Sequence, residues 1–137
     1  MMKTEKEYEA AKVQLAKLNE LYTSQLKDLK SKGLTAAQAK DSLSSSLTYA
    51  NQCQEEIALY EKLKNGELPP LEHFSSTGKY FVAARIAKGM TQRELAEKLG
   101  LKESAVSRDE RNEYHGMSVE KMERLAEALK IKILMSA

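Results

Sequence analysis

Two short helix-forming segments separated by a single glycine constrain the fold of this chain more than any other feature. Thr91 and Glu94 have the spacing of a helix N-terminal capping box. Gly100 ends the first segment, because a left-handed backbone conformation costs glycine little. After a short turn, a second helix is predicted over residues 104–112. Two helices joined this tightly are expected to cross closely, so that the second helix can enter a major groove of DNA.

Composition and charge agree with this interpretation. The only two prolines of the 137 residues are adjacent, and helix-forming residues dominate elsewhere, so the fold is predicted to be all-α. Residues 78–137 carry 12 Lys and Arg against 9 Asp and Glu, whereas residues 1–77 carry 10 Lys against 11 acidic residues. All five arginines lie in the second half. Because Arg offers a planar donor fork that suits phosphates and guanine edges, a nucleic-acid partner is favoured for that half.

The segment TQRELAEKLGLKESAVSRDER closely resembles the Xre family, the helix-turn-helix domains of lambda-type phage repressors and Cro proteins. The later segment MSVEKMERLAEALKIKI is similar to the fourth helix and final turn of that family. The resemblance covers about residues 78–133. It implies a four- to five-helix Cro/repressor-type domain that binds double-stranded DNA, usually as a homodimer.

The resemblance also implies which residues contact DNA. Thr91 and Gln92 would meet backbone phosphate, and Arg111 and Asn112 would lie near the flanking backbone. Six further residues would face the groove: Lys102, Glu103, Ser104, Ala105, Ser107 and Arg108. Arg108 is the leading candidate for a strong base or phosphate contact, Ala105 for a thymine methyl, and Glu103 for a cytosine amine.

Four residues depart from the family pattern, and the first is Glu103, which stands where Gln or Ser is often found. Asp109 stands where these domains usually have an apolar or aromatic residue, and we expect it to pair with Arg108, Arg111 or a backbone amide, or to mark a displaced helix end. Tyr114 and His115 replace a common small, basic and proline-containing loop. Tyr114 is expected to pack under the loop, and a phosphate contact by Tyr114 or His115 is the alternative.

The first half predicts a long helical hairpin. Apolar residues recur at steps of three and four from Tyr8 to Leu29, and again from Ala36 to Leu63, as on one face of a helix. Helices of roughly 27 and 30 residues joined by a short turn should form an antiparallel pair. An irregularity is expected near residues 44–46, where three serines lower the helix propensity.

These patterns divide the chain into three parts. Residues 1–66 form the hairpin, a dimerisation or partner-binding arm. Residues 67–77, which include the proline pair and a serine pair, form a linker. Residues 78–137 form the helix-turn-helix domain.

The predicted function is a sequence-specific transcriptional regulator, most simply a repressor, that reads a near-palindromic operator with the helix at 104–112. The alternative is the antitoxin of a type II toxin–antitoxin pair, because the opening TEKEYEAAKVQLAKLNEL is similar to the start of some antitoxins. In that case the hairpin would bind a protein toxin, and the domain would regulate its own operon.

Other classes of function are not expected. There is no Cys/His cluster, phosphate-binding glycine loop or nucleophile–base pair, so we predict no enzyme activity, no catalytic residue, no metal and no cofactor. Cys53 is the single cysteine and cannot form an intrachain disulfide. With no signal-peptide pattern and no apolar stretch of spanning length, a cytoplasmic protein without a membrane partner is expected.

Overall fold

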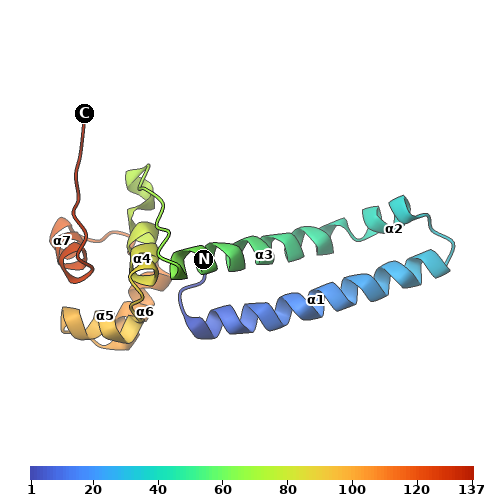
Figure 1. Cartoon of the computed structure of the whole chain (residues 1–137), viewed down its shortest axis with the longest axis horizontal. Helices are drawn as coiled ribbons and strands as arrows, with labels where there is room; N and C mark the ends of the chain where they lie inside the picture. Colours follow the sequence, from blue (N-terminus) through green and yellow to red (C-terminus); the bar gives the residue numbers. More distant parts are fainter. The chain divides into compact units, whose positions relative to one another are not determined.

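The computed structural model describes all 137 residues and confirms the all-α prediction (Figure 1). It contains no strand. The α-helices are α1 (Glu5–Ser31), α2 (Ala36–Ser42), α3 (Ser44–Lys64), α4 (Thr77–Ala87), α5 (Gln92–Leu99), α6 (Glu103–Arg111) and α7 (Val119–Ala128), and a short 3₁₀ helix, η1, covers Phe74–Ser76. The chain divides into two compact units, Met1–Leu59 and Tyr60–Ala137. None of the helices is both long enough and apolar enough to cross a membrane.

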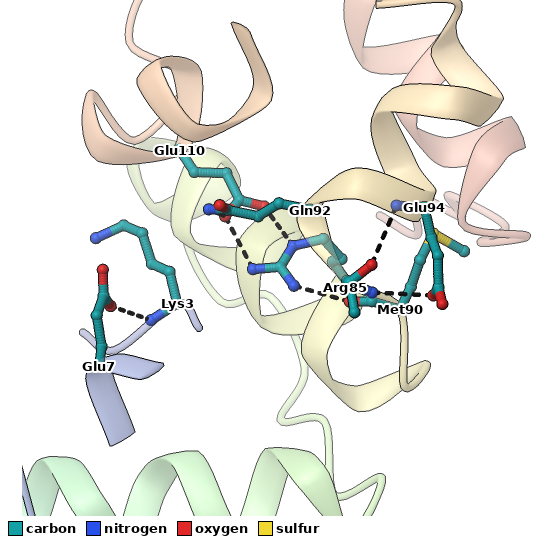
Figure 2. Close-up of polar contacts among 8 residues, drawn as sticks. Lys3, Glu7, Arg85, Met90, Gln92, Glu94 and Glu110 are labelled. Carbon is teal, nitrogen blue, oxygen red and sulfur yellow. Dashed lines mark hydrogen bonds and ion pairs between the residues drawn. The ribbon is translucent and has the colours of Figure 1, made fainter. Parts of the chain in front are cut away.

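The first unit is an antiparallel helical hairpin, in which α3 runs back along α1 (Figure 1). The Thr4 side chain caps α1 by accepting a hydrogen bond from the Glu7 backbone N–H at 3.2 Å. The Glu7 carboxylate accepts from the backbone N–H of Lys3 at 2.8 Å, one residue before the cap (Figure 2). A complete capping box at Thr35 starts the return helix.

The return helix is broken, whereas the sequence pattern predicted a single helix with a local irregularity. α2 ends at Ser42, and α3 begins at Ser44 immediately after Leu43. Next to the break, the Ser42 hydroxyl donates to the Gln38 carbonyl at 3.0 Å. Serine hydroxyls compete with the backbone for such groups, so a serine-rich segment is where a long helix is easily interrupted.

The hairpin buries little of its apolar surface. No residue of α1 is buried, and the apolar stripe of that helix is only half-buried. The buried apolar residues of this unit are Met2, Ala39, Ala50 and Ile57. Two helices alone cannot enclose their apolar faces, so the hairpin has only a thin core.

The second unit holds the denser core. It starts inside α3, where Tyr60 and Leu63 are buried, and so takes in the last turn of the predicted hairpin. In α4 the six consecutive residues 81–86 are all buried. Side chains from the three later helices complete this core: Leu95 and Ala96 of α5, Val106 of α6, and Leu125 and Ala126 of α7, with Leu129 directly after α7.

Gly78, in the first turn of α4, allows the loop after α6 to approach the backbone closely. A Cβ atom at this position would lie 1.7 Å from the carbonyl oxygen of Glu113. Glu113 and Tyr114 both adopt positive φ angles, 53° and 51°. The strained loop is thus held against the one residue of α4 that leaves room for it.

We expect Gly78→Ala to lower the free energy of unfolding by about 1–3 kcal/mol, because the clash is with backbone and needs a shift of the loop. Chemical denaturation followed by circular dichroism measures this. Ser75→Ala, at an exposed position, is the control and should leave stability unchanged. Equal stability of the two variants would show that the loop at Glu113 can shift without loss of stability.

Candidate nucleic-acid interface

The predicted turn between the two short helices is present. Thr91 and Glu94 form a complete capping box at the start of α5, with bonds of 3.1 and 3.0 Å. Gly100 caps the end of α5 in the left-handed conformation, at φ 67° and ψ 29°. The Leu101 N–H then donates to the Ala96 carbonyl at 2.9 Å. These local bonds turn the chain sharply into α6.

The second helix of the motif, α6, is displaced by one residue from the predicted range of 104–112. It begins at Glu103 and ends at Arg111, with Lys102 at the N-cap and Asn112 at the C-cap. The Lys102 side chain makes no capping hydrogen bond. Glu103, in the first turn, lies where an acidic side chain interacts favourably with the helix dipole, which favours the earlier start.

A buried ion pair holds α6 against α4. Arg85 of α4 is 3% exposed and Glu110 of α6 is 0% exposed. Their contact is bidentate: Arg85 Nε donates to Glu110 Oε1, and Arg85 Nη2 donates to Glu110 Oε2 at 2.9 Å (Figure 2). Arg85 Nη1 also donates to the Met90 carbonyl at 2.8 Å. The pair thus connects α4, α6 and the turn that leads into α5.

The Gln92 side chain belongs to the same network. It is buried, and its Nε2 donates to Glu110 Oε2 at 2.7 Å (Figure 2). A phosphate contact by the Gln92 amide, as the family resemblance implies, would therefore compete with this bond. The backbone N–H groups in the first turn of α5 are the other donors that this end of the helix offers to phosphate.

Sequence reasoning missed the roles of Arg85 and Glu110, although the sequence carried a signal for both. Glu110 follows the inward-facing Val106 by four residues, so it lies on the same face of the helix. Arg85 interrupts the apolar run FVAARIA. A charge in such a run, with an opposite charge on the inner face of a nearby helix, favours a buried pair.

Of the other predicted contact residues, Thr91 lies at the N-cap of α5, and all the others lie on α6 or at its two caps. Ala105 and Ser107 are half-buried, and the rest are exposed: Thr91, Lys102, Glu103, Ser104, Arg108, Arg111 and Asn112. No ion pair within the chain engages Lys102, Arg108 or Arg111. The predicted residues of α6 and its caps lie within one short helix, and the contact of all these residues with DNA stays a prediction.

Asp109 pairs with a different residue from those expected. Its Oδ2 accepts from Lys121 Nζ of α7 at 2.5 Å, and not from Arg108, Arg111 or a backbone amide, so those expected pairings are wrong. Lys121 lies one helix further along the chain, where local sequence gave no indication of it. Asp109 therefore forms no ion pair with either arginine of α6, and Arg108 and Arg111 are exposed without an acidic partner.

Tyr114 packs under the loop, the first of the two alternatives. It is buried, and burial raises the pKa of its hydroxyl well above the usual value, with a further increase from the nearby charge of Glu110. The Lys121 ammonium also lies 5.8 Å from the centre of the Tyr114 ring. His115 is exposed.

Removal of one partner of the buried ion pair should strongly destabilise the fold. We expect Glu110→Ala to lower the free energy of unfolding by about 3–5 kcal/mol, because it leaves the Arg85 guanidinium buried without its acid. The double variant Arg85→Met/Glu110→Leu should regain most of that loss, because it leaves no buried charge. Denaturation of the three proteins, followed by circular dichroism, gives the comparison. A double variant that is no more stable than Glu110→Ala would contradict coupling between the two side chains.

Comparison with known proteins identifies the second unit. Residues 82–134, from α4 to the segment after α7, match the helix-turn-helix family model. No curated protein and no solved structure matches the chain. The matched range contains the capped α5, the Gly100 turn and α6. This segment is therefore a helix-turn-helix domain of the Xre type, and it gives the chain the DNA-binding domain of a transcription regulator.

Proposed function

We propose that the protein is a sequence-specific repressor that binds a near-palindromic operator with α6 in the major groove. The observation that carries this proposal is the separation of charge on α6. Glu110 pairs with Arg85 of α4, and Asp109 pairs with Lys121 of α7. Arg108 and Arg111, in contrast, are exposed and have no acidic partner. The outward side of the helix is thus positive and available to DNA.

Each outward residue has a role that suits its chemistry. Arg108 can donate two hydrogen bonds to a guanine edge, and the exposed Ser104 hydroxyl can contact a base or phosphate. Ala105 is small and half-buried, so it can contact a thymine methyl at close range. Glu103 can accept from a cytosine amine, and because phosphates repel it, its presence favours base choice over general affinity.

Residues at the edges of the motif would position the domain on the backbone. Thr91 and the first N–H groups of α5 form one phosphate site, which the positive end of the helix dipole favours. Lys102, Arg111 and Asn112 can reach phosphates beyond it. Such contacts fix the orientation of the protein without reading sequence.

A single helix-turn-helix domain reads one half-site, so repression of a near-palindromic operator requires two copies of the chain. The two-fold symmetry of the operator then matches that of a homodimer. Binding over a promoter would exclude polymerase, and no catalytic activity is needed for this role.

The test is binding of the full chain to its own upstream promoter region, measured by gel shift or fluorescence anisotropy at about 150 mM salt with random DNA as competitor. We expect Arg108→Gln to weaken specific binding by about 1–3 kcal/mol, or roughly 5- to 150-fold.

The matched control is Arg124→Gln. Arg124 lies on α7, is exposed and pairs with Glu120 of its own helix at 3.1 Å, so the substitution removes the same charge away from α6. Its affinity should stay within about twofold of the original. Equal losses in the two variants would mean that net charge, and not α6, determines binding.

The antitoxin is a second candidate function, and the thin core of the hairpin favours it. α1 buries no residue, and Val13 and Leu21 of that helix are exposed. A hairpin that leaves this much apolar surface open suits a partner that folds against it.

If the protein is an antitoxin, the product of a small basic reading frame adjacent to its gene should co-purify with it. Val13→Asp/Leu21→Asp should abolish this co-purification and leave operator binding intact. The exposed Ser24→Asp is the control on the same helix and should retain the partner. An adjacent product that binds the doubly substituted chain equally well would exclude the hairpin as the binding arm.

A further inference from the structure

The ion pair between Asp109 and Lys121 joins two helices of the DNA-binding domain. Lys121 Nζ lies 2.5 Å from Asp109 Oδ2, and the side chains of Lys121 and Asp109 are 36% and 26% exposed, respectively. The Lys121 ammonium also lies 5.8 Å from the centre of the buried Tyr114 ring. The carboxylate and the aromatic ring together hold the ammonium beside α6, where water reaches it only in part.

Neither charge of this pair is favoured by its own helix. Asp109 lies in the last turn of α6, at the negative end of the helix dipole. Lys121 lies in the first turn of α7, at the positive end, where the Ser118 hydroxyl accepts a hydrogen bond from its backbone N–H at 3.1 Å. Because the two helix dipoles disfavour these charges, the contact between the two side chains is what stabilises them there.

Asp109 also lies at the edge of the surface that is proposed to meet DNA. Residues three and four positions apart are neighbours on a helix, so Asp109 adjoins both Ala105 and Asn112. Ala105 is half-buried, Asn112 is exposed, and both belong to the predicted DNA contacts. An Asp109 carboxylate without its cation would repel phosphates and compete with them for Arg108 and Arg111.

We propose that Lys121 is a positioning residue for DNA binding, which acts through Asp109 and does not itself contact DNA. Its ammonium neutralises the Asp109 carboxylate and holds it toward α7, so that this carboxylate does not oppose the phosphates of a bound duplex. The inference rests on the proposed function, because it requires that α6 is the element that meets DNA. DNA affinity then depends on a residue of α7, outside the predicted contacts.

The test compares four proteins: the original chain, Lys121→Gln, Asp109→Asn and the variant with both substitutions. Glutamine and asparagine keep the approximate size of the original side chains and remove their charges. The affinity of each full chain is measured by fluorescence anisotropy at about 150 mM salt, on the duplex of the upstream promoter region and on a random duplex. Chemical denaturation followed by circular dichroism shows that each variant is folded at the temperature of the binding measurement.

We expect Lys121→Gln to weaken binding to the promoter duplex by at least about fivefold, because it leaves Asp109 as an unpaired carboxylate. The ratio of the two affinities should fall toward one as salt is raised, because salt screens the repulsion. Asp109→Asn should bind no more weakly than the original chain. The double variant has the net charge of the original chain and should return to within about twofold of its affinity.

Two control variants are matched to Lys121→Gln. Lys121→Arg keeps a cation beside Asp109 and should stay within about twofold of the original affinity. Arg124→Gln removes a cation from the same helix and frees Glu120, with which Arg124 pairs at 3.1 Å. It makes the same change in net charge without touching the contact to α6, so its affinity should also stay within about twofold.

Three results would overturn the proposal. The first is a Lys121→Gln variant that binds the promoter duplex as tightly as the original chain. The second is a double variant that binds as weakly as Lys121→Gln, which would make Lys121 a direct DNA contact or a residue needed only for the fold. The third is an equal loss in Arg124→Gln, which would assign the effect to net charge alone.

Failure of this proposal can be told from failure of the proposed function. An original chain that binds both duplexes equally removes the sequence-specific repressor, but its affinities for the random duplex still test Lys121, since phosphate repulsion does not depend on sequence. Specific operator binding that Lys121→Gln leaves unchanged keeps the repressor and removes the role of Lys121. An original chain that binds neither duplex removes both.

Discussion

The arrangement of the DNA-binding unit depends on the bidentate contact between Arg85 and Glu110. Burial of two charges costs a large desolvation energy, which only close geometry and further hydrogen bonds offset. Gln92 and the Met90 carbonyl supply those bonds, and no buried side-chain polar atom lacks a partner. Because the contact joins three helices, it determines how α5 and α6 are held relative to α4. An apolar contact has no directional bonds, so it would restrict the relative orientation of the helices less.

The same contact divides α6 into two faces of different function. Glu110 and Val106 face the core, and Asp109 is neutralised by Lys121 at the side. The outer side of α6 carries two arginines without an acidic partner, the acidic Glu103 and small neighbours. Asp109 and Glu110 thus serve the fold, whereas Glu103, Arg108 and Arg111 remain exposed to solvent.

Local features of the fold could be predicted from the sequence, and features that depend on distant residues could not. The capping box of Thr91 and the Gly100 turn need only residues within one or two helical turns. Lys121, the partner of Asp109, lies 12 residues away, and Glu110 lies 25 residues from Arg85. Such pairs depend on tertiary packing, which one sequence does not reveal. The interruption at Leu43 was expected only as an irregularity. Helix propensity indicates where a helix is weak, but it does not determine whether the helix ends there.

The separation of the two faces of α6 also bears on how such a protein can diverge. Residues on its outer side, such as Ser104 and Arg108, have no structural duty in the core, so mutations there are almost neutral for folding. Duplicated copies of the gene could therefore drift to new operators one substitution at a time without passing through unstable intermediates. Arg85 and Glu110 have no such freedom, because a substitution of either one leaves the charge of the other buried without a partner. The scaffold would thus be inherited almost unchanged while its target sequence evolves.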